Sequence, residues 1–124
     1  MLVRAKVLAG YKVRIAGLAD KLGVRCKTHA HLVKAKDIQD VVNLLTKFIE
    51  YLTSEIAALD STRGEAIRRL QAHRRLARSI RSRCFTMMET YDISRGRAKP
   101  PEFYELLSEL PRQLRNLARR LPDD

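Results

Sequence analysis

The chain has 124 residues and carries 25 Lys and Arg against 14 Asp and Glu, so its formal net charge is +11 at pH 7. Its length fits one domain, and 45% hydrophobic residues exclude a disordered chain. No apolar run approaches the roughly 18 residues of a membrane-spanning helix. Charges from Arg4 to Arg14 interrupt the region where a signal peptide needs an apolar core, so secretion by that route is not expected. Five Gly, four Pro and no Trp are few for a hairpin-rich β-sandwich, so helices are expected.

Charge is segregated along the chain. Residues 1–36 carry a net charge of +8, residues 37–60 of −4, residues 61–99 of +8 and residues 100–124 of −1. Two segments therefore hold all of the excess positive charge. Because so one-sided a charge repels itself unless an anion neutralises it, we expect an anionic partner.

The first segment predicts two helices. Helical spacing of apolar residues from Val3 to Leu22 predicts a helix over 2–22. Gly23 is expected to end this helix, and a shorter one is expected over 28–36. The cations are spread around the first helix instead of gathering opposite its apolar stripe. We therefore interpret residues 1–36 as a basic helix-turn-helix arm that contacts partners on several sides.

The acidic segment predicts a core helix over 37–59, with Asp37 placed to cap its start. The next helix is expected over 61–93, because Thr62-Arg63-Gly64-Glu65 has the spacing of a capping box. Thirty residues would extend about 45 Å, which is long for a bundle of this size, so a break or a projecting end is expected.

On a helical wheel of about 100° per residue, this long helix has two faces. Six arginines occupy an arc of roughly 140°, and apolar residues from Leu70 to Tyr91 fill another. The separation is incomplete, since Ile67 and Phe85 fall within the arginine arc and Arg69 falls within the apolar one. The arginines of the arc are Arg63, Arg68, Arg74, Arg75, Arg78 and Arg81.

A basic loop precedes the last helix, which is expected over 101–121. Pro101 suits its first position, and Pro111 should kink or restart it. The expected fold class is therefore all-α within a single domain. A basic helix-turn-helix arm over residues 1–36 is followed by a small helical bundle over 37–124 with one long Arg-rich helix.

Nucleic acid is the partner that this charge layout favours. Residues after 60 hold fourteen Arg and one Lys, and a guanidinium group can bind phosphate oxygens bidentately. With three Phe, four Tyr and no Trp, a platform that stacks single-stranded bases is poorly supplied. We therefore expect contacts to a duplex backbone without sequence preference. The alternatives are an arginine face that is merely solvated, as in thermophile proteins, and a helix at a membrane surface.

Candidate metal ligands lie near the end of the first segment. Cys26, His29 and His31, with Cys84 or His73 as a fourth ligand, match no strong zinc signature. A buried free thiol and a core histidine are the more ordinary interpretation of Cys84 and His73. No metal site and no cofactor are therefore expected.

One enzymatic pattern gives an alternative from a different class. Arg68-x4-His73 and Arg25-x5-His31 satisfy the loose Arg-x4–6-His pattern of the HEPN ribonucleases, which are small helical bundles. In an Arg-rich chain this pattern arises by chance, and Arg69 follows Arg68 where that family often has a polar residue. A protein without enzymatic activity is expected; a HEPN-like all-α ribonuclease is the alternative. A nucleoid or ribonucleoprotein-associated binding protein is third.

The chain combines a basic N-terminal arm with a small helical bundle, is cationic and has few Asn and Gln. In these features it resembles the major capsid proteins of filamentous and rod-shaped viruses of hyperthermophilic archaea, the rudivirus, lipothrixvirus and tristromavirus group. The resemblance spans Arg4 to Arg120 and rests on architecture and charge layout. It implies a structural nucleocapsid protein, located in the virion and, during assembly, in the host cytoplasm.

In that family two copies, identical or paralogous, form a dimer whose N-terminal helices wrap double-stranded DNA in the A-form, and dimers build a helical filament. Because charges surround the apolar stripe of residues 3–22, we expect the arm to be extended or mobile in the isolated subunit and helical within an oligomer on nucleic acid. Without residues 1–36, a soluble bundle built on 37–121 that forms no filaments is expected. The expected DNA-binding residues are Arg4, Lys6, Lys12, Arg14, Lys21, Arg25, Lys27, Lys34, Arg68, Arg74, Arg75, Arg78 and Arg81.

Overall fold

A computed structural model describes residues 2–95 and 97–123, with side chains from residue 5 onward. The described part is helical, with no strand, which confirms the all-α prediction. The elements in chain order are α1 (Leu2–His29), a 3₁₀ turn η1 (Ala30–Leu32), α2 (Ala35–Ala58), a 3₁₀ turn η2 (Ser61–Arg63), α3 (Gly64–Ser94) and α4 (Pro101–Arg119).

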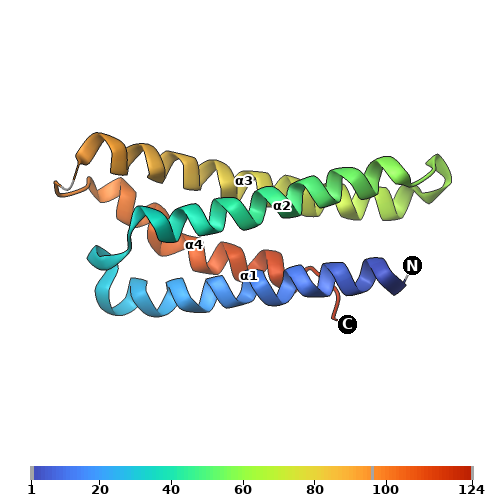
Figure 1. Cartoon of the computed structure of the whole chain (residues 1–124), viewed down its shortest axis with the longest axis horizontal. Coiled ribbons are helices and arrows are strands. Elements are labelled where there is room, and N and C mark those ends of the chain that lie inside the picture. The colour runs from blue at the N-terminus through green and yellow to red at the C-terminus, as the bar shows by residue number, and fades with distance from the viewer. Residues whose placement is uncertain (1, 96, 124) are drawn as a thin grey trace.

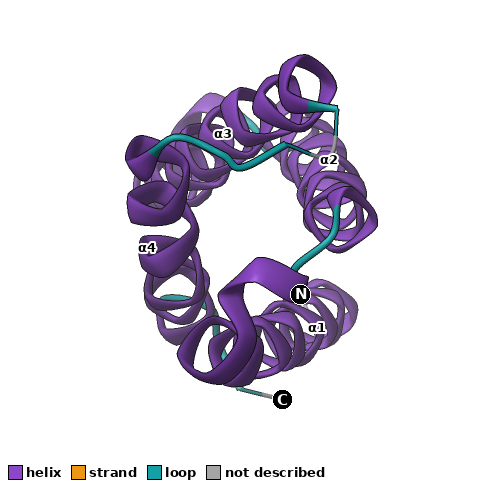
Figure 2. Cartoon of the chain, turned by 90° about the vertical axis from the view of Figure 1, so that its left-hand side faces the viewer, coloured by secondary structure: helices purple, strands orange, loops and turns teal. Residues whose placement is uncertain are grey.

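The helices run up and down in chain order and form an antiparallel bundle (Figure 1). Helix α2 packs mainly against α3, and α1 packs mainly against α4. An end-on view shows the four helices around one centre, with α1 and α3 diagonally opposed (Figure 2). Within the described residues, none of the helices combines the length and the apolar character needed to cross a membrane.

Helix α2 is the most continuous part of the core. Its buried side chains recur every three or four residues from Ile38 to Leu52, as the sequence predicts. Phe48 is fully buried, and its ring centroid lies 5.0 Å from that of Tyr11 on α1. Such aromatic pairs stabilise a core beyond the area they bury, so α2 holds α1 in place as well as α3.

The start of α2 is capped by Asp37, in agreement with the sequence. Lys34 is extended and occupies the N-cap position, and its N–H donates to Oδ2 of Asp37 at 2.9 Å. Arg25 Nη1 donates to the same oxygen at 2.7 Å. One carboxylate thus satisfies a backbone donor of the helix start and also ties α1 to α2.

The expected helix-turn-helix arm is wrong, because α1 continues through Gly23 to His29. Residues 30–34 form only the turn η1 and two extended residues, so the predicted helix over 28–36 is absent. A glycine inside a helix costs only about 1 kcal/mol, and burial of Ala19 and Leu22 in the turn before Gly23 offsets that cost. At Gly23 a Cβ would lie 2.8 Å from Nη2 of Arg115 and 3.8 Å from Cβ of Pro111.

Residues 1–36 therefore do not stand apart from the bundle. Ile15, Ala19, Leu22 and Val33 belong to the same buried cluster as the core residues of α2, α3 and α4. In the single chain the expected mobile arm is instead one wall of the bundle. The apolar stripe of α1 finds its partner within the chain, chiefly on α4.

Replacing Gly23 with Ala is expected to raise the free energy of unfolding by about 0.5–1 kcal/mol. The new methyl group meets only the end of the Arg115 side chain, which can move, and the exposed contact of Arg115 Nε with Asp20 at 3.5 Å contributes little. Urea denaturation measures the change. If Gly23 ended a helix, as the sequence alone predicts, Gly23→Ala would destabilise the protein instead.

The predicted capping box at the start of α3 is also wrong. Asp60 caps the preceding turn η2, since its carboxylate accepts from the N–H of Thr62 at 2.9 Å and also from the Thr62 hydroxyl. Those hydrogen bonds also lower the pKa of Asp60. Glu65 pairs with Arg69 at 3.1 Å, one turn further along the helix. Helix α3 then runs for 31 residues without a break.

Helix α4 begins with Pro101, as predicted, and continues through Pro111, where a kink or a restart is expected from the sequence. The buried Pro111 lies opposite Gly23 of α1, and a Cβ at Gly23 would lie 3.8 Å from its Cβ, an ordinary contact distance. At 19 residues, α4 is about 28 Å long, whereas α3 is about 46 Å long. Helix α4 therefore ends before the opposite end of the bundle, where only α1, α2 and α3 remain (Figure 1).

Candidate functional site

The most strongly charged surface lies on α3. From Ala66 to Met88 the sequence holds seven arginines and no carboxylate, over about 33 Å of helix. Ala77, Ile80, Cys84 and Met87 turn toward the core. We call the five predicted arginines of this helix the arginine face, and they are Arg68, Arg74, Arg75, Arg78 and Arg81.

The arginine face has uncharged neighbours on α2. Arg74 Nη1 donates to the hydroxyl of Thr53 at 3.2 Å, and Arg81 Nη1 donates to the hydroxyl of Thr46 at 3.2 Å. Among the described residues, no ion pair involves any of the five arginines. The threonines hold the two guanidinium groups in place and leave their charge uncompensated.

A shallow depression of about 280 Å³ lies between the side chains of Gln71, Arg74, Arg75 and Arg78. The guanidinium carbon of Arg81 lies 5.6 Å from the ring centroid of exposed Phe85, which continues the same side of the helix. Three guanidinium groups and an amide around one hollow offer several donors to an anion such as phosphate.

The predicted cations of α1 divide into two kinds. Lys12 donates to the carbonyl of Leu121 at 3.1 Å and pairs with Asp123 at 2.9 Å, and Arg25 pairs with Asp37. The charges of Lys12 and Arg25 are therefore engaged in contacts within the protein. The side chain of Arg4 lies outside the described residues. The exposed members of the predicted set are Lys6, Arg14, Lys21, Lys27 and Lys34.

Near the end of α1 the structure brings three predicted cations together. Lys21, Arg25 and Lys34 line a hollow of about 590 Å³ between α1 and α2. The sequence analysis missed three further members of its lining, Lys36, Asp37 and Asp40. The two carboxylates partly neutralise this surface, so it is less cationic than the arginine face. The two hollows share no lining residue, so the two basic surfaces are separate.

The candidate metal and catalytic residues are not assembled. In the described part of the chain no three His, Cys, Asp or Glu side chains are grouped as metal ligands. Cys26 Sγ donates to the carbonyl of Leu107 at 3.6 Å, and Cys84 is buried, which raises the pKa of its thiol to about 12. Arg68 is exposed, whereas His73, about 140° further around the helix, points into the bundle.

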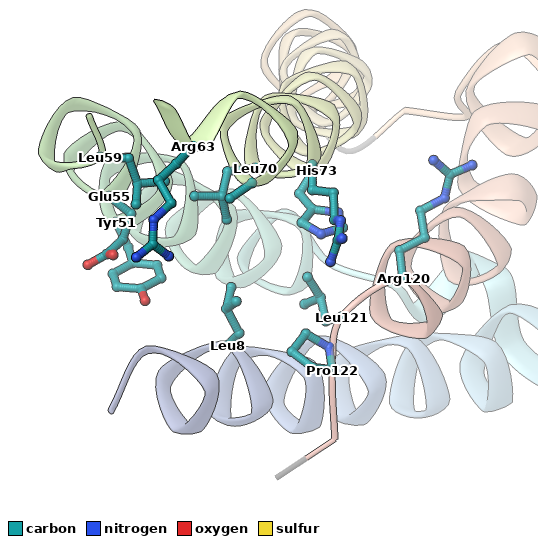
Figure 3. Close-up of a pocket in the computed structure, with 12 residues that line it drawn as sticks. Leu8, Tyr51, Glu55, Leu59, Arg63, Leu70, His73, Arg120, Leu121 and Pro122 are labelled. Atoms are coloured by element: carbon teal, nitrogen blue, oxygen red, sulfur yellow. The ribbon is translucent and has the colours of Figure 1, made fainter. Parts of the chain in front are cut away.

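His73 lines a cavity of about 330 Å³ at the end of the bundle that α4 does not reach. We call it the end cavity. Its middle is apolar and its ends carry polar groups (Figure 3). The apolar lining consists of Leu8, Leu59, Ala66, Leu70, Leu121 and Pro122. The polar lining consists of Tyr51, Glu55, Arg63, Arg69, His73 and Arg120.

The sequence analysis missed the end cavity. Leu70, His73, Ala77 and Ile80 follow one another at alternating three- and four-residue spacing, so the imidazole occupies a core position of α3. A single polar side chain in a row of apolar core positions can indicate a polar site inside the bundle. The sequence also predicts the end of α4 to within two residues, but only the packing of α4 against α1 and α3 shows which end of the bundle it leaves open.

His73 is half-buried, and its Nδ1 is buried and has no hydrogen-bond partner in the described part of the chain. Burial lowers the pKa of His73 below its ordinary value of 6.5, and the positive charges of Arg120 and Arg69 lower it further. In neutral solution the imidazole is therefore uncharged.

The free energy of unfolding is expected to fall as pH decreases from about 7.5 to about 5.5, because unfolded His73 takes up a proton at a higher pH than folded His73 does. His73→Gln should flatten this part of the pH profile. Urea denaturation at several pH values measures it, with exposed His31→Gln as the control. An equal flattening by both variants would show that burial of His73 is not the cause.

The structure thus presents an uncompensated arginine face, a second and more mixed basic surface, and one lined cavity. Searches of protein-family models, of curated proteins and of solved structures find no match to this chain.

Proposed function

We propose that this protein is a non-enzymatic structural protein that binds double-stranded nucleic acid through phosphate contacts, without sequence preference. The observation that carries the proposal is the acid-free run of seven arginines on α3. A duplex presents about one negative charge per 1.7 Å of its axis, so a cationic helix of this length can meet several phosphates. Contacts of this kind position a protein on a duplex and do not distinguish bases.

The arrangement of α2 argues against a face that is merely solvated. Where arginines stabilise a thermophile protein, they do so in networks with Asp and Glu. Here the two arginines that reach α2 meet the hydroxyls of Thr46 and Thr53 instead of carboxylates. The mutual repulsion of these arginines is therefore unrelieved within the described chain, and an anionic partner would relieve it.

Assembly is the second part of the proposal. A subunit with two separate basic surfaces can contact two turns or two segments of nucleic acid. Helix α1 belongs to the bundle and is not a separate arm as in the capsid proteins of archaeal filamentous viruses. The cationic chain and the small helical bundle still resemble those proteins, and with the two basic surfaces they support a nucleocapsid subunit. It would act as a homodimer or a heterodimer, polymerise on double-stranded DNA and reside in the virion.

Binding to two duplexes of equal length and unrelated sequence tests the first part. We expect similar affinities, and a plot of log K against log salt with a slope of about −7 if about eight phosphates are neutralised per subunit. Fluorescence anisotropy at several salt concentrations measures both. An affinity that does not respond to salt, or a preference of several kcal/mol for one sequence, would contradict the proposal.

Electron microscopy of the protein mixed with duplex DNA tests the second part. A regular helical filament would support a nucleocapsid, whereas scattered particles would leave an ordinary nucleoid-type binder. RNA cleavage that disappears in His73→Ala would instead support the ribonuclease alternative.

A further inference from the structure

The end cavity is the feature that the proposed function does not use. It is bounded by α1, α2, α3 and the residues after α4, and its volume of about 330 Å³ falls within the range of small-molecule sites. At roughly 30 Å³ per non-hydrogen atom, it has room for about ten of them. It is a site for a small ligand and not for a macromolecule.

The lining determines what kind of ligand fits. The middle of the cavity is formed by Leu8, Leu70, Leu121 and Pro122 (Figure 3). The charged groups of the lining are three arginines and one glutamate, and Glu65, outside the lining, pairs with Arg69 at 3.1 Å. Arg63 and Arg120 against Glu55 leave an excess of one positive charge, which favours an anion over a cation. A ligand that matches both features has an apolar tail and a single negatively charged head.

His73 marks the end of the cavity where the head group of the ligand would lie. Nδ1 of His73 is buried and has no hydrogen-bond partner among the described residues, and such a group costs a folded protein about 1–3 kcal/mol. Arg120 and Arg69 line the cavity near it and lower the pKa of the imidazole, and Arg69 is paired with Glu65 at 3.1 Å. With a turn of the ring that brings Nδ1 to the cavity surface, a carboxylate at this end would accept its hydrogen bond and lie near the guanidinium group of Arg120.

We propose that the end cavity binds a small organic carboxylate, with its head at His73 and Arg120 and its apolar tail between Leu8 and Leu70. The opposite end carries Tyr51, Glu55 and Arg63 and lies beyond the tail (Figure 3). Neither the arginine face nor the hollow at Lys21 contributes to the site. The proposal therefore stands independently of duplex binding.

Octanoate is the probe, because it has a carboxylate, an unbranched tail and a size that matches the cavity. Isothermal titration of the full chain should show one saturable site. Octanol, which has the same tail, should bind about tenfold more weakly, because it lacks the charge-assisted hydrogen bond. Octylammonium should not bind. Equal binding of octanoate and octanol would overturn the proposal, as would the absence of saturation.

Two neighbouring arginines give a matched pair of variants. Arg120 lines the cavity and Arg119 does not, although both are exposed and both substitutions remove one positive charge. Arg120→Gln should weaken octanoate binding about threefold, as for an exposed ion pair, and Arg119→Gln should leave it unchanged. Equal losses would show that octanoate follows the net charge, which would overturn the site.

The role of His73 is tested by NMR of its ring nitrogens. Octanoate should shift the Nδ1 resonance of His73 and leave those of exposed His29 and His31 in place. His73→Phe, which keeps a ring and removes the donor, should weaken binding about tenfold. If that variant fails to fold, the resonance shift in the unsubstituted protein decides the point, since an unmoved resonance would exclude His73 from the site.

Discussion

A chain that lacks residues 1–36 is expected to be unfolded. Helix α1 contributes Ile15, Ala19 and Leu22 to the core, and its removal would expose the apolar face of α4 that it covers. The loss of several fully buried side chains exceeds the net stability of a typical domain, which is only about 5–15 kcal/mol. Circular dichroism of the truncated chain measures the result.

Two substitutions on α1 test the same point without a deletion. Ile15 is fully buried and Val13 is 72% exposed on the same helix. Ile15→Ala should lower the free energy of unfolding by about 2–5 kcal/mol, whereas Val13→Ala should change it by less than about 0.5 kcal/mol. If both variants were equally stable, α1 would be an arm, as the sequence alone predicts, and not a wall of the bundle.

Removing two charges from the arginine face is expected to weaken duplex binding by roughly fiftyfold at about 0.1 M salt. Arg75 and Arg78 are exposed, line the same depression and form no described ion pair, so Gln at both positions should leave the fold intact. Because each phosphate contact contributes about 0.9 to the salt dependence, the slope should become shallower by about 2. Anisotropy titrations at several salt concentrations give both values.

The matched control removes two exposed arginines from α4. Arg112→Gln with Arg119→Gln changes the net charge by the same amount, away from the arginine face. Its salt dependence should stay close to that of the unsubstituted protein. A similar loss of duplex affinity in both double variants would mean that binding follows the overall charge. The arginine face would then not be the duplex-binding surface.

Periodicity was sufficient to predict most of the fold. The spacing of apolar residues in α2 and the proline at the start of α4 are local signals, and the structure agrees with them. The misplaced boundaries depend on contacts between segments. Gly23 stays helical because α1 packs against α4, with Pro111 opposite the glycine.

The basic surfaces were predictable only in part. A helical wheel places the arginine face correctly, because it uses one helix alone. It cannot show that Lys12 and Arg25 are engaged with Asp123 and Asp37, since those carboxylates come from other parts of the chain. The end cavity depends on four segments and on the length difference between α3 and α4, so no single stretch of sequence encodes it.

The two packed helix pairs differ in sequence separation: α2 and α3 follow one another in the chain, whereas α1 and α4 come from its two ends. Helices α2 and α3 are joined by residues 59–63, whereas Lys12 of α1 meets Leu121 across 109 residues. Closing a short loop costs less conformational entropy, and local contacts form faster. The α2–α3 hairpin is therefore expected to form first during folding. Docking of α1 onto α4 is then the slow step, and it sets the folding rate of the whole chain.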